Sequence, residues 1–339
     1  MIIHGVAFCI LSATALPILP IKLNDVDNGN LLLPFGIIGD MDSQARQGNV
    51  WHSPMVIGTL TLTADRKSAA VEWLSSFNYT SVLNYGNRGM ELSDLIYFNG
   101  KLMSIDDKTG IVYRIDGRKV IPWIILSDGN GTDPTPFKGE WLTLKDGFLY
   151  CGSNGKERTT PMGEFINDSP MYVKRISKDG VVESQNWVQR FISLRAAIEI
   201  LFPGYVIHEA VQWSKVHKRW FFLPRHMSKL AYNVNTVEET GANVLLSANE
   251  NFTNFNAVMI GHEVLTKGFS AFQFVPGTND TVIVAIKSQE LARLPFASFI
   301  MVFTIHGRII LDETRIPGDI KYEGISFLTE EYLKTLYNQ

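Results

Sequence analysis

Short apolar segments alternate with tight turns along most of this chain, a pattern typical of β-strands. The segments are rich in β-branched and aromatic residues and end at glycine, asparagine or aspartate. Several pairs flank two-residue turns, for example Asn99-Gly100 and Asp146-Gly147, and each such pair predicts a β-hairpin. Residues 330–338 form the best short helical candidate. The pattern as a whole predicts an all-β protein.

A second hairpin follows the first in the repeated units. Its turns lie at Asp116-Gly117 in VYRIDGRKV and at His306-Gly307 in MVFTIHGRIIL. Two consecutive hairpins make a four-stranded meander, which is the unit of a β-propeller blade. The sequence therefore predicts a series of blades.

An oxygen-bearing side chain recurs at a fixed place in these units. Four of these residues lie seven positions before a residue in the turn of the first hairpin, and a fifth begins a similar segment near the C-terminus. The five are Ser93, Glu140, Glu209, Ser270 and Glu323. Their spacings of 47, 69, 61 and 53 residues are close to the size of a four-stranded blade with loops. The repeat predicts five blades in one ring.

The last predicted blade must take strands from both ends of the chain, because the chain ends soon after Glu323. The N-terminal segments FGIIGDMDS, GTLTLT and AAVEWL are available for this purpose, and ring closure removes exposed sheet edges. A two-sheet sandwich also has short strands and glycine-rich turns, but it gives no reason for the regular offset. We expect a single five-bladed β-propeller domain over residues 33–330.

The five recurring oxygens predict a cation site at the centre of the ring. The first strand of each blade lines the central channel, so residues at matching offsets converge there. Three carboxylates pressed together repel one another unless a cation lies between them. Hard oxygen ligands without cysteine or histidine favour Ca²⁺ over Zn²⁺, and the mixed set suits calcium better than magnesium. Any one of these residues alone would be interpreted as a solvated strand end.

Further acidic and basic residues lie in loops near the inner ends of strands. The acids are Asp40, Asp42, Asp94, Asp106 and Asp107, and the bases are Arg46, Arg88, Lys156 and Arg225. Phosphoryl transfer to water needs three parts: a carboxylate that orients or deprotonates the water, a metal ion, and basic groups that hold the phosphate. Each acid taken singly is more typical of a turn cap or a surface ion pair.

Composition and motifs exclude several other classes of protein. The 339 residues carry a formal net charge of −3, without the concentrated basic stripe of a nucleic-acid-binding protein. The sequence contains no GxGxxG, no Walker-type phosphate loop, no HExxH and no CxxC pair. We expect no nucleic-acid or membrane partner, and a monomer or a weak dimer.

The N-terminus predicts a secreted protein. An apolar stretch runs into Ala13-Thr14-Ala15, which is typical of a signal peptide over residues 1–15, and Pro17 and Pro20 interrupt the run before it could form an anchor helix. Cleavage there would remove Cys9 and leave Cys151 without a disulfide partner.

Asn-x-Ser/Thr sequons agree with the secretory route. The predicted glycosylation sites are Asn78, Asn130, Asn251 and Asn279. A fifth sequon, at Asn167, is the least convincing because Pro170 follows its serine.

Long segments of the chain resemble one enzyme family. They include IIGDMDSQAR, NRGMELSDLIYFNGKLMSIDDKTGIVYRI, KGEWLTLKDGFLYCGSNGKE, GYVIHEAVQWSKVHKRWFFLPR, GFSAFQFVPGTND and KYEGISF. These segments resemble the calcium-activated nucleotidase (apyrase) family, which includes the bed-bug-type salivary apyrases and a vertebrate relative. The resemblance covers roughly residues 35–328.

The resemblance implies a five-bladed propeller with one Ca²⁺ in its channel, held at the same five oxygen residues that the repeat selects. It implies that the catalytic acids lie on the GDMD and IDDKTG segments, at Asp40 or Asp42 and at Asp107, with Asp94 close by. Which of them activates water is left open. Arg225 and Lys156 match basic positions of the family's motifs.

We therefore expect a secreted, calcium-dependent apyrase that removes terminal phosphates from ATP and ADP. The insect resemblance suggests a salivary inhibitor of platelet aggregation. Two alternatives are kept: a non-catalytic secreted propeller that binds small ligands, and a calcium-dependent hydrolase of another phosphoester.

Overall fold

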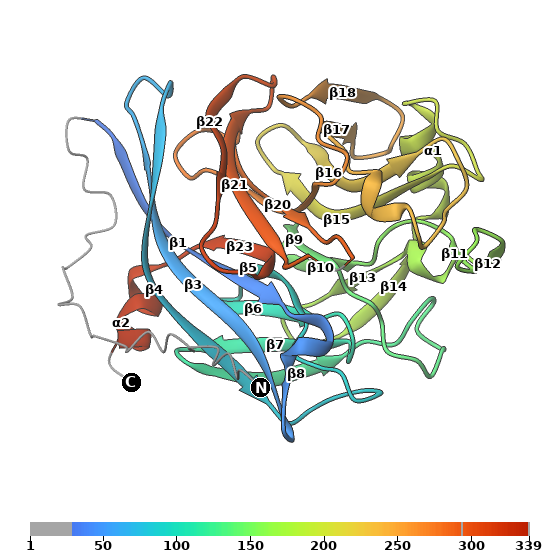
Figure 1. The fold of residues 1–339 in the computed structure, drawn as a ribbon, viewed down its shortest axis with the longest axis horizontal. Coiled ribbons are helices and arrows are strands. Elements are labelled where there is room, and N and C mark those ends of the chain that lie inside the picture. The colour runs from blue at the N-terminus through green and yellow to red at the C-terminus, as the bar shows by residue number, and fades with distance from the viewer. Residues whose placement is uncertain (1–28, 293, 338–339) are drawn as a thin grey trace, which may run out of the picture.

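The computed structural model describes residues 29–292 and 294–337, and most of its strands belong to five antiparallel sheets arranged in a ring (Figure 1). The innermost strands of neighbouring sheets contact one another in the order β5, β9, β15, β19 and β23, and β23 contacts β5 again. This closed series confirms the predicted five-bladed β-propeller. The predicted signal peptide, residues 1–15, and the predicted helix end at Asn338 lie outside the described residues.

Four blades are formed by strands in sequence order with the first strand innermost, and in blade 2 the hairpin β11–β12 (residues 158–167) is inserted between the second and third strands. Blade 1 contains β5 (Leu92–Phe98), β6 (Lys101–Asp106), β7 (Ile111–Asp116) and β8 (Lys119–Ile125). Blade 2 contains β9 (Trp141–Lys145), β10 (Phe148–Gly152), β13 (Tyr172–Ile176) and β14 (Val182–Asn186). Blade 3 contains β15 (Tyr205–Ser214), β16 (Arg219–Ser228), β17 (Val244–Asn249) and β18 (Phe255–Met259). Blade 4 contains β19 (Gly268–Phe274), β20 (Val282–Gln289), β21 (Ala297–Thr304) and β22 (Ile309–Arg315).

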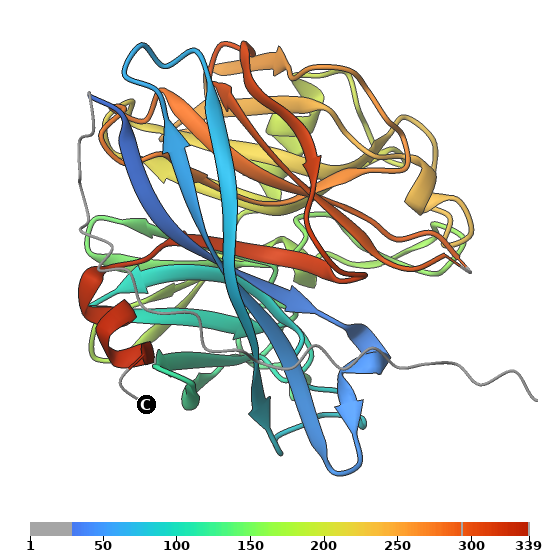
Figure 2. The same cartoon turned by 60° about the vertical axis from the view of Figure 1, so that its left-hand side comes forward.

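The fifth blade joins strands from both ends of the chain, as the sequence predicts. Its innermost strand is β23 (Lys321–Phe327), followed outward by β1 (Leu31–Asp40), β3 (Val50–Leu62) and β4 (Ala69–Ser81), and the short β2 (Arg46–Gln47) pairs with β3. Figure 2 shows the N-terminal strands, in blue, in the same part of the ring as the C-terminal β23, in red. Asp40, at the end of β1, pairs with Lys321, at the start of β23.

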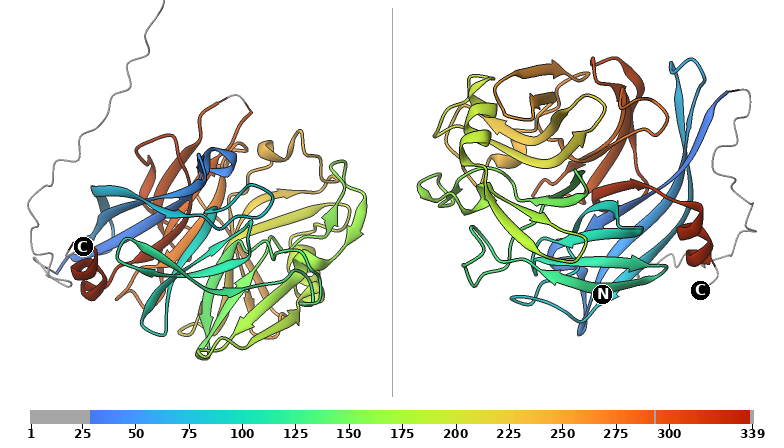
Figure 3. Two further views of the ribbon diagram at one scale, coloured as in Figure 1. Left: turned by 90° about the horizontal axis from the view of Figure 1, so that it is seen from below. Right: turned by 180° about the vertical axis from the view of Figure 1, so that it is seen from behind.

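The remaining elements are short and lie between or outside the blades. They are the hairpin β11 (Arg158–Thr159) and β12 (Phe165–Asn167), the helices α1 (Val188–Ala196) and α2 (Glu330–Tyr337), and three 3₁₀ turns at Asp42–Ala45, Ser169–Met171 and Val237–Glu239. Figure 3 shows α2, in red, at the outside of the ring. The helix α2 confirms the predicted C-terminal helix, whereas α1 was not predicted.

The hairpin turns adopt the conformations that their residues favour. Asn99 and Gly100 have φ angles of 49° and 73°, and Asp146 and Gly147 have φ angles of 52° and 78°. Two consecutive positive φ angles define the two-residue turn whose twist matches that of antiparallel strands, and Asn-Gly and Asp-Gly adopt it readily. These turns confirm the predicted hairpins.

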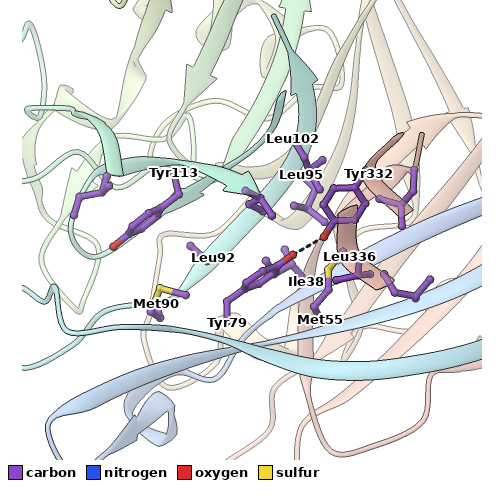
Figure 4. Close-up of a cluster of buried hydrophobic side chains, with 14 of the residues drawn as sticks. Ile38, Met55, Tyr79, Met90, Leu92, Leu95, Leu102, Tyr113, Tyr332 and Leu336 are labelled. Atoms are coloured by element: carbon purple, nitrogen blue, oxygen red, sulfur yellow. Dashed lines mark hydrogen bonds between the residues drawn. The ribbon is translucent and has the colours of Figure 1, made fainter. Parts of the chain in front are cut away.

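Helix α2 packs against blades 5 and 1 through its apolar face. Tyr332, Leu333 and Leu336 are buried in one cluster with Met55 of β3 and Leu95 of β5. The Tyr332 hydroxyl lies 2.6 Å from the hydroxyl of Tyr79 on β4 (Figure 4). The C-terminal helix thus covers the junction between the blade that closes the ring and its neighbour.

We predict that Leu333→Ala lowers the free energy of unfolding by about 2–4 kcal/mol, because it removes a buried leucine from this junction. The adjacent Lys334 is exposed and makes one ion pair with Glu330 at 2.6 Å, so Lys334→Ala should cost less than about 1 kcal/mol. Chemical denaturation of the two variants tests the difference. Equal losses would show that packing of α2 does not stabilise the ring.

Candidate active site

Four of the five predicted ring residues lie where an innermost strand departs from regular pairing. On β15, His208 and Ala210 have partners on β16 but Glu209 has none; on β19, Ser270 is skipped in the same way. Glu323 is skipped between Tyr322 and Gly324 on β23, and Ser93 lies in the irregular part of β5. A bulge re-aims the side chain of the extra residue, so these irregularities set the direction of the ring side chains.

The fifth residue, Glu140, reaches the centre in another way. It directly precedes β9, and its N–H donates to the carbonyl of Gly152 on β10 at 2.8 Å. The next residue, Trp141, is fully buried and its indole donates to the carbonyl of Ser153 at 3.0 Å. The backbone of Glu140 and the side chain of the following residue are thus both held by the strand segment around Gly152 and Ser153.

The ring residues converge through direct contacts. Arg225, on β16, donates to Glu209 Oε2 at 2.7 Å and to Glu323 Oε1 at 2.9 Å. Ser93 Oγ lies 3.4 Å from Glu323 Oε2, and Ser270 Oγ donates to the carbonyl of Tyr322 at 2.7 Å. These contacts bring together residues from four blades, and their role as calcium ligands is still a prediction.

The electrostatics of the ring suit a cation. Burial, reinforced by mutual repulsion, raises the pKa of Glu140 to about 7, that of Glu209 to about 7 and that of Glu323 to about 8. All the donors are hard oxygens, and none is a thiol or an imidazole. This donor set fits Ca²⁺, which would relieve the repulsion that raises these pKa values.

A second group of acids lies beside the ring. One oxygen from each of Asp40, Glu91 and Asp107 lies within 4.8 Å of the other two, and all three residues are buried. The N–H of Asp107 donates to the carbonyl of Glu91 at 3.0 Å, which holds these two residues side by side. The Asp106 carboxylate accepts from the N–H of Met90 at 2.8 Å and thereby ties the loop before β5 to the end of β6.

Two lysines connect this acidic group to the ring. Lys138 contacts both Asp107, at 2.7 Å, and Glu140. Lys321 contacts Asp40 at 2.7 Å and Glu323 at 3.3 Å. Both lysines precede their ring glutamate by two residues, in Lys138-Gly-Glu140 and Lys321-Tyr-Glu323, and this shared Lys-x-Glu pattern was the sequence signal that could have identified them.

Comparison with known proteins identifies the family. The family profile described as Apyrase matches residues 39–328. The chain belongs to the apyrase family.

Curated relatives agree over most of the chain. It is 47% identical over 304 residues to apyrase apy-1 of Caenorhabditis elegans, covering 89% of this chain and 86% of the relative. It is 46% identical over 303 residues to soluble calcium-activated nucleotidase 1 of Rattus norvegicus, covering 88% and 75% respectively. It is 41% identical over 308 residues to the apyrase of Cimex lectularius, covering 89% and 84% respectively.

In this apyrase-family protein, Arg88 and Asp42 complete the acidic group. Arg88 donates through Nε to Glu91 Oε1 at 2.6 Å and through Nη2 to Asp42 Oδ1 at 2.6 Å. Burial acts to raise the pKa of Asp42, but Lys321 and Arg88 outweigh it and hold that pKa low. Burial raises the pKa of Glu91 to about 8, with added repulsion from Asp40 and Asp107. Glu91 is a site residue that sequence analysis missed.

Three predicted residues have contacts apart from this group. Asp94 is buried and accepts from the N–H of Leu142 at 2.7 Å, so that it links β5 to β9. Arg46 is exposed and donates to the carbonyl of Gly48 at 2.8 Å. Lys156 Nζ donates to the carbonyl of Glu157 at 2.6 Å and lies 4.5 Å from the centre of the Tyr232 ring. Their catalytic and phosphate-binding roles stay predictions.

Among residues 29–292 and 294–337, every helix is too short or too polar to cross a bilayer.

We predict that calcium stabilises the protein more at about pH 7.5 than at about pH 5.5. The folded pKa values of Glu140, Glu209 and Glu323 are raised, so the cation-free fold loses stability as pH rises above the unfolded value of 4.5 towards 7–8. Calcium should remove this loss. Thermal unfolding followed by tryptophan fluorescence, with chelator and with calcium at both pH values, measures the effect.

The variant Glu209→Gln serves as the control for this experiment. It removes one of the repelling carboxylates, so it should reduce both the calcium effect and its pH dependence. An equal calcium-induced rise in Tm at both pH values in the wild-type protein would contradict the proposed electrostatics.

Proposed function

We propose that this protein hydrolyses the terminal phosphates of nucleoside triphosphates and diphosphates, ATP and ADP among them, in a calcium-dependent reaction that ends at the monophosphate. The observation that carries the proposal is the buried group of acids and bases at the centre of the ring, contributed by strands and loops of several blades. Membership of the apyrase family and the names of its calcium-activated relatives support it.

The chain's own residues supply the parts of the reaction. Arg88 and Arg225 provide planar guanidinium groups beside the carboxylates, and such groups match the geometry of phosphate oxygens. A carboxylate of the Asp40 and Asp107 group accepts a proton from water as the water oxygen bonds to the terminal phosphorus. The bond from that phosphorus to the bridging oxygen breaks, the shortened nucleotide departs with that oxygen, and inorganic phosphate is released. Calcium bound at the ring would neutralise negative charge near the phosphates.

We further propose that the protein is secreted and glycosylated. The four predicted acceptor asparagines are all exposed at the surface, where a glycan could be attached: Asn78, Asn130, Asn251 and Asn279. Hydrolysis of extracellular ADP would limit platelet aggregation, which is the role that the resemblance to insect salivary apyrases suggests.

The direct test is phosphate release from ATP, ADP, UDP and AMP by the purified protein, measured with calcium, with magnesium and with chelator. We predict release from ATP and ADP only when calcium is present, and no release from AMP. Release from a different phosphoester alone would replace the nucleotide proposal with another hydrolase. Tight nucleotide binding without any release would make the protein a non-catalytic binder.

Two matched variants make this test specific to the site. Asp107→Asn should retain the fold but lose activity by about 100-fold or more, because it removes a carboxylate from the acidic group. Asp312→Asn, an equivalent change on the exposed outer strand β22, should have full activity. Equal activity of the two variants would remove Asp107 from the mechanism.

A further inference from the structure

Two lysine side chains bridge two groups of carboxylates. One group is the ring, with Glu140 and Glu323 among its members. The other is the acidic cluster, which we define as Asp40, Glu91 and Asp107. Lys138 and Lys321 each contact one carboxylate from each group. The acidic cluster is defined by the spacing of its own three oxygens, and each lysine links it to one carboxylate of the ring.

We propose that the acidic cluster binds a divalent cation of its own, in addition to the calcium proposed for the ring. The three carboxylates each offer an oxygen within 4.8 Å of the others. A calcium ion holds its oxygen ligands at about 2.3–2.6 Å, so one ion can contact oxygens that are up to about 5 Å apart. Three buried carboxylates with this spacing are a donor set for a hard cation.

An unpartnered atom in the cluster supports this site independently. Asp107 is 6% exposed, and its Oδ2 contacts Lys138 at 2.7 Å. Its Oδ1 is buried and has no hydrogen-bond partner among the described residues. A buried polar atom without a partner costs stability, and an ionised carboxylate oxygen costs more than a neutral one. A cation in the cluster would give this oxygen the partner that the chain does not provide.

The charges around the centre also favour more than one cation. Among the described residues, nine carboxylates share ion pairs with only four cationic side chains, Arg88, Lys138, Arg225 and Lys321. The nine are Asp40, Asp42, Glu91, Asp107, Glu140, Glu209, Glu238, Glu290 and Glu323.

The excess is five negative charges when all nine carboxylates are ionised, and one divalent cation in the ring would leave three. A nucleotide phosphate chain is itself an anion and would be repelled by that remainder. A second divalent cation reduces the excess to one. We assign this second cation to the acidic cluster, which contains the unpartnered oxygen of Asp107.

The experiment counts calcium ions bound per chain by equilibrium dialysis at millimolar calcium, with the full-length metal-free protein and no nucleotide. We predict two ions for the wild-type protein and two for Asp312→Asn, the surface control. Asp107→Asn should bind one ion, because it neutralises the carboxylate with the unpartnered oxygen. Glu209→Gln should also bind one, because it weakens the ring and leaves the cluster intact.

A single ion in the wild-type protein, or two ions in Asp107→Asn, would overturn the second site. Tryptophan fluorescence reports whether each variant is folded, and Glu91→Gln replaces Asp107→Asn if the latter does not fold. Ion counting needs no catalysis, so its result is independent of the phosphate-release test. A wild-type protein that binds one ion and still hydrolyses ADP would refute the second site and leave the proposed function standing.

Discussion

The pairing of β1 with β23 is the constraint on which the rest of the structure depends. It joins the two ends of the described chain in one sheet, and its register places Asp40 opposite Lys321. The same strand carries Glu323, which contacts Ser93 of the next blade and Arg225 of blade 3. Gly324 allows this close approach, because a Cβ there would meet the Asp94 backbone at 2.7 Å. The pairing that closes the ring is therefore the same pairing that positions Glu323 and Lys321 at the centre.

Bulges in the innermost strands direct the side chains of the ring residues towards the centre of the propeller. Regular β-strands point alternate side chains to opposite faces of a sheet, which in a propeller are the packed faces between blades. Most of the ring side chains reach the centre where this pairing breaks, whereas Glu140 does so from the position just before β9. Glu209, Ser270 and Glu323 each lie at such a break. These three residues thereby lie outside the regular register of their strands.

Much of this architecture could be predicted from the sequence, because turns and oxygen residues recur with the period of a blade. The helix α1 could not, since it is short, has Trp187 at its N-cap without a capping side-chain hydrogen bond and buries the charged Arg195 against Glu157. Glu91 was missed because it belongs to no repeat. Its place in the site depends on the contact with Arg88 and on the backbone hydrogen bond to Asp107, which forms only when two strand ends pack together.

The central claim is that carboxylates from separate blades converge to hold a cation. Crystals grown with calcium and measured for anomalous scattering test it most directly. We predict a peak within about 2.3–2.6 Å of oxygens from Glu140, Glu209 and Glu323. Ordered carboxylates with no peak between them, and with Arg225 and the lysines as their only partners, would contradict it.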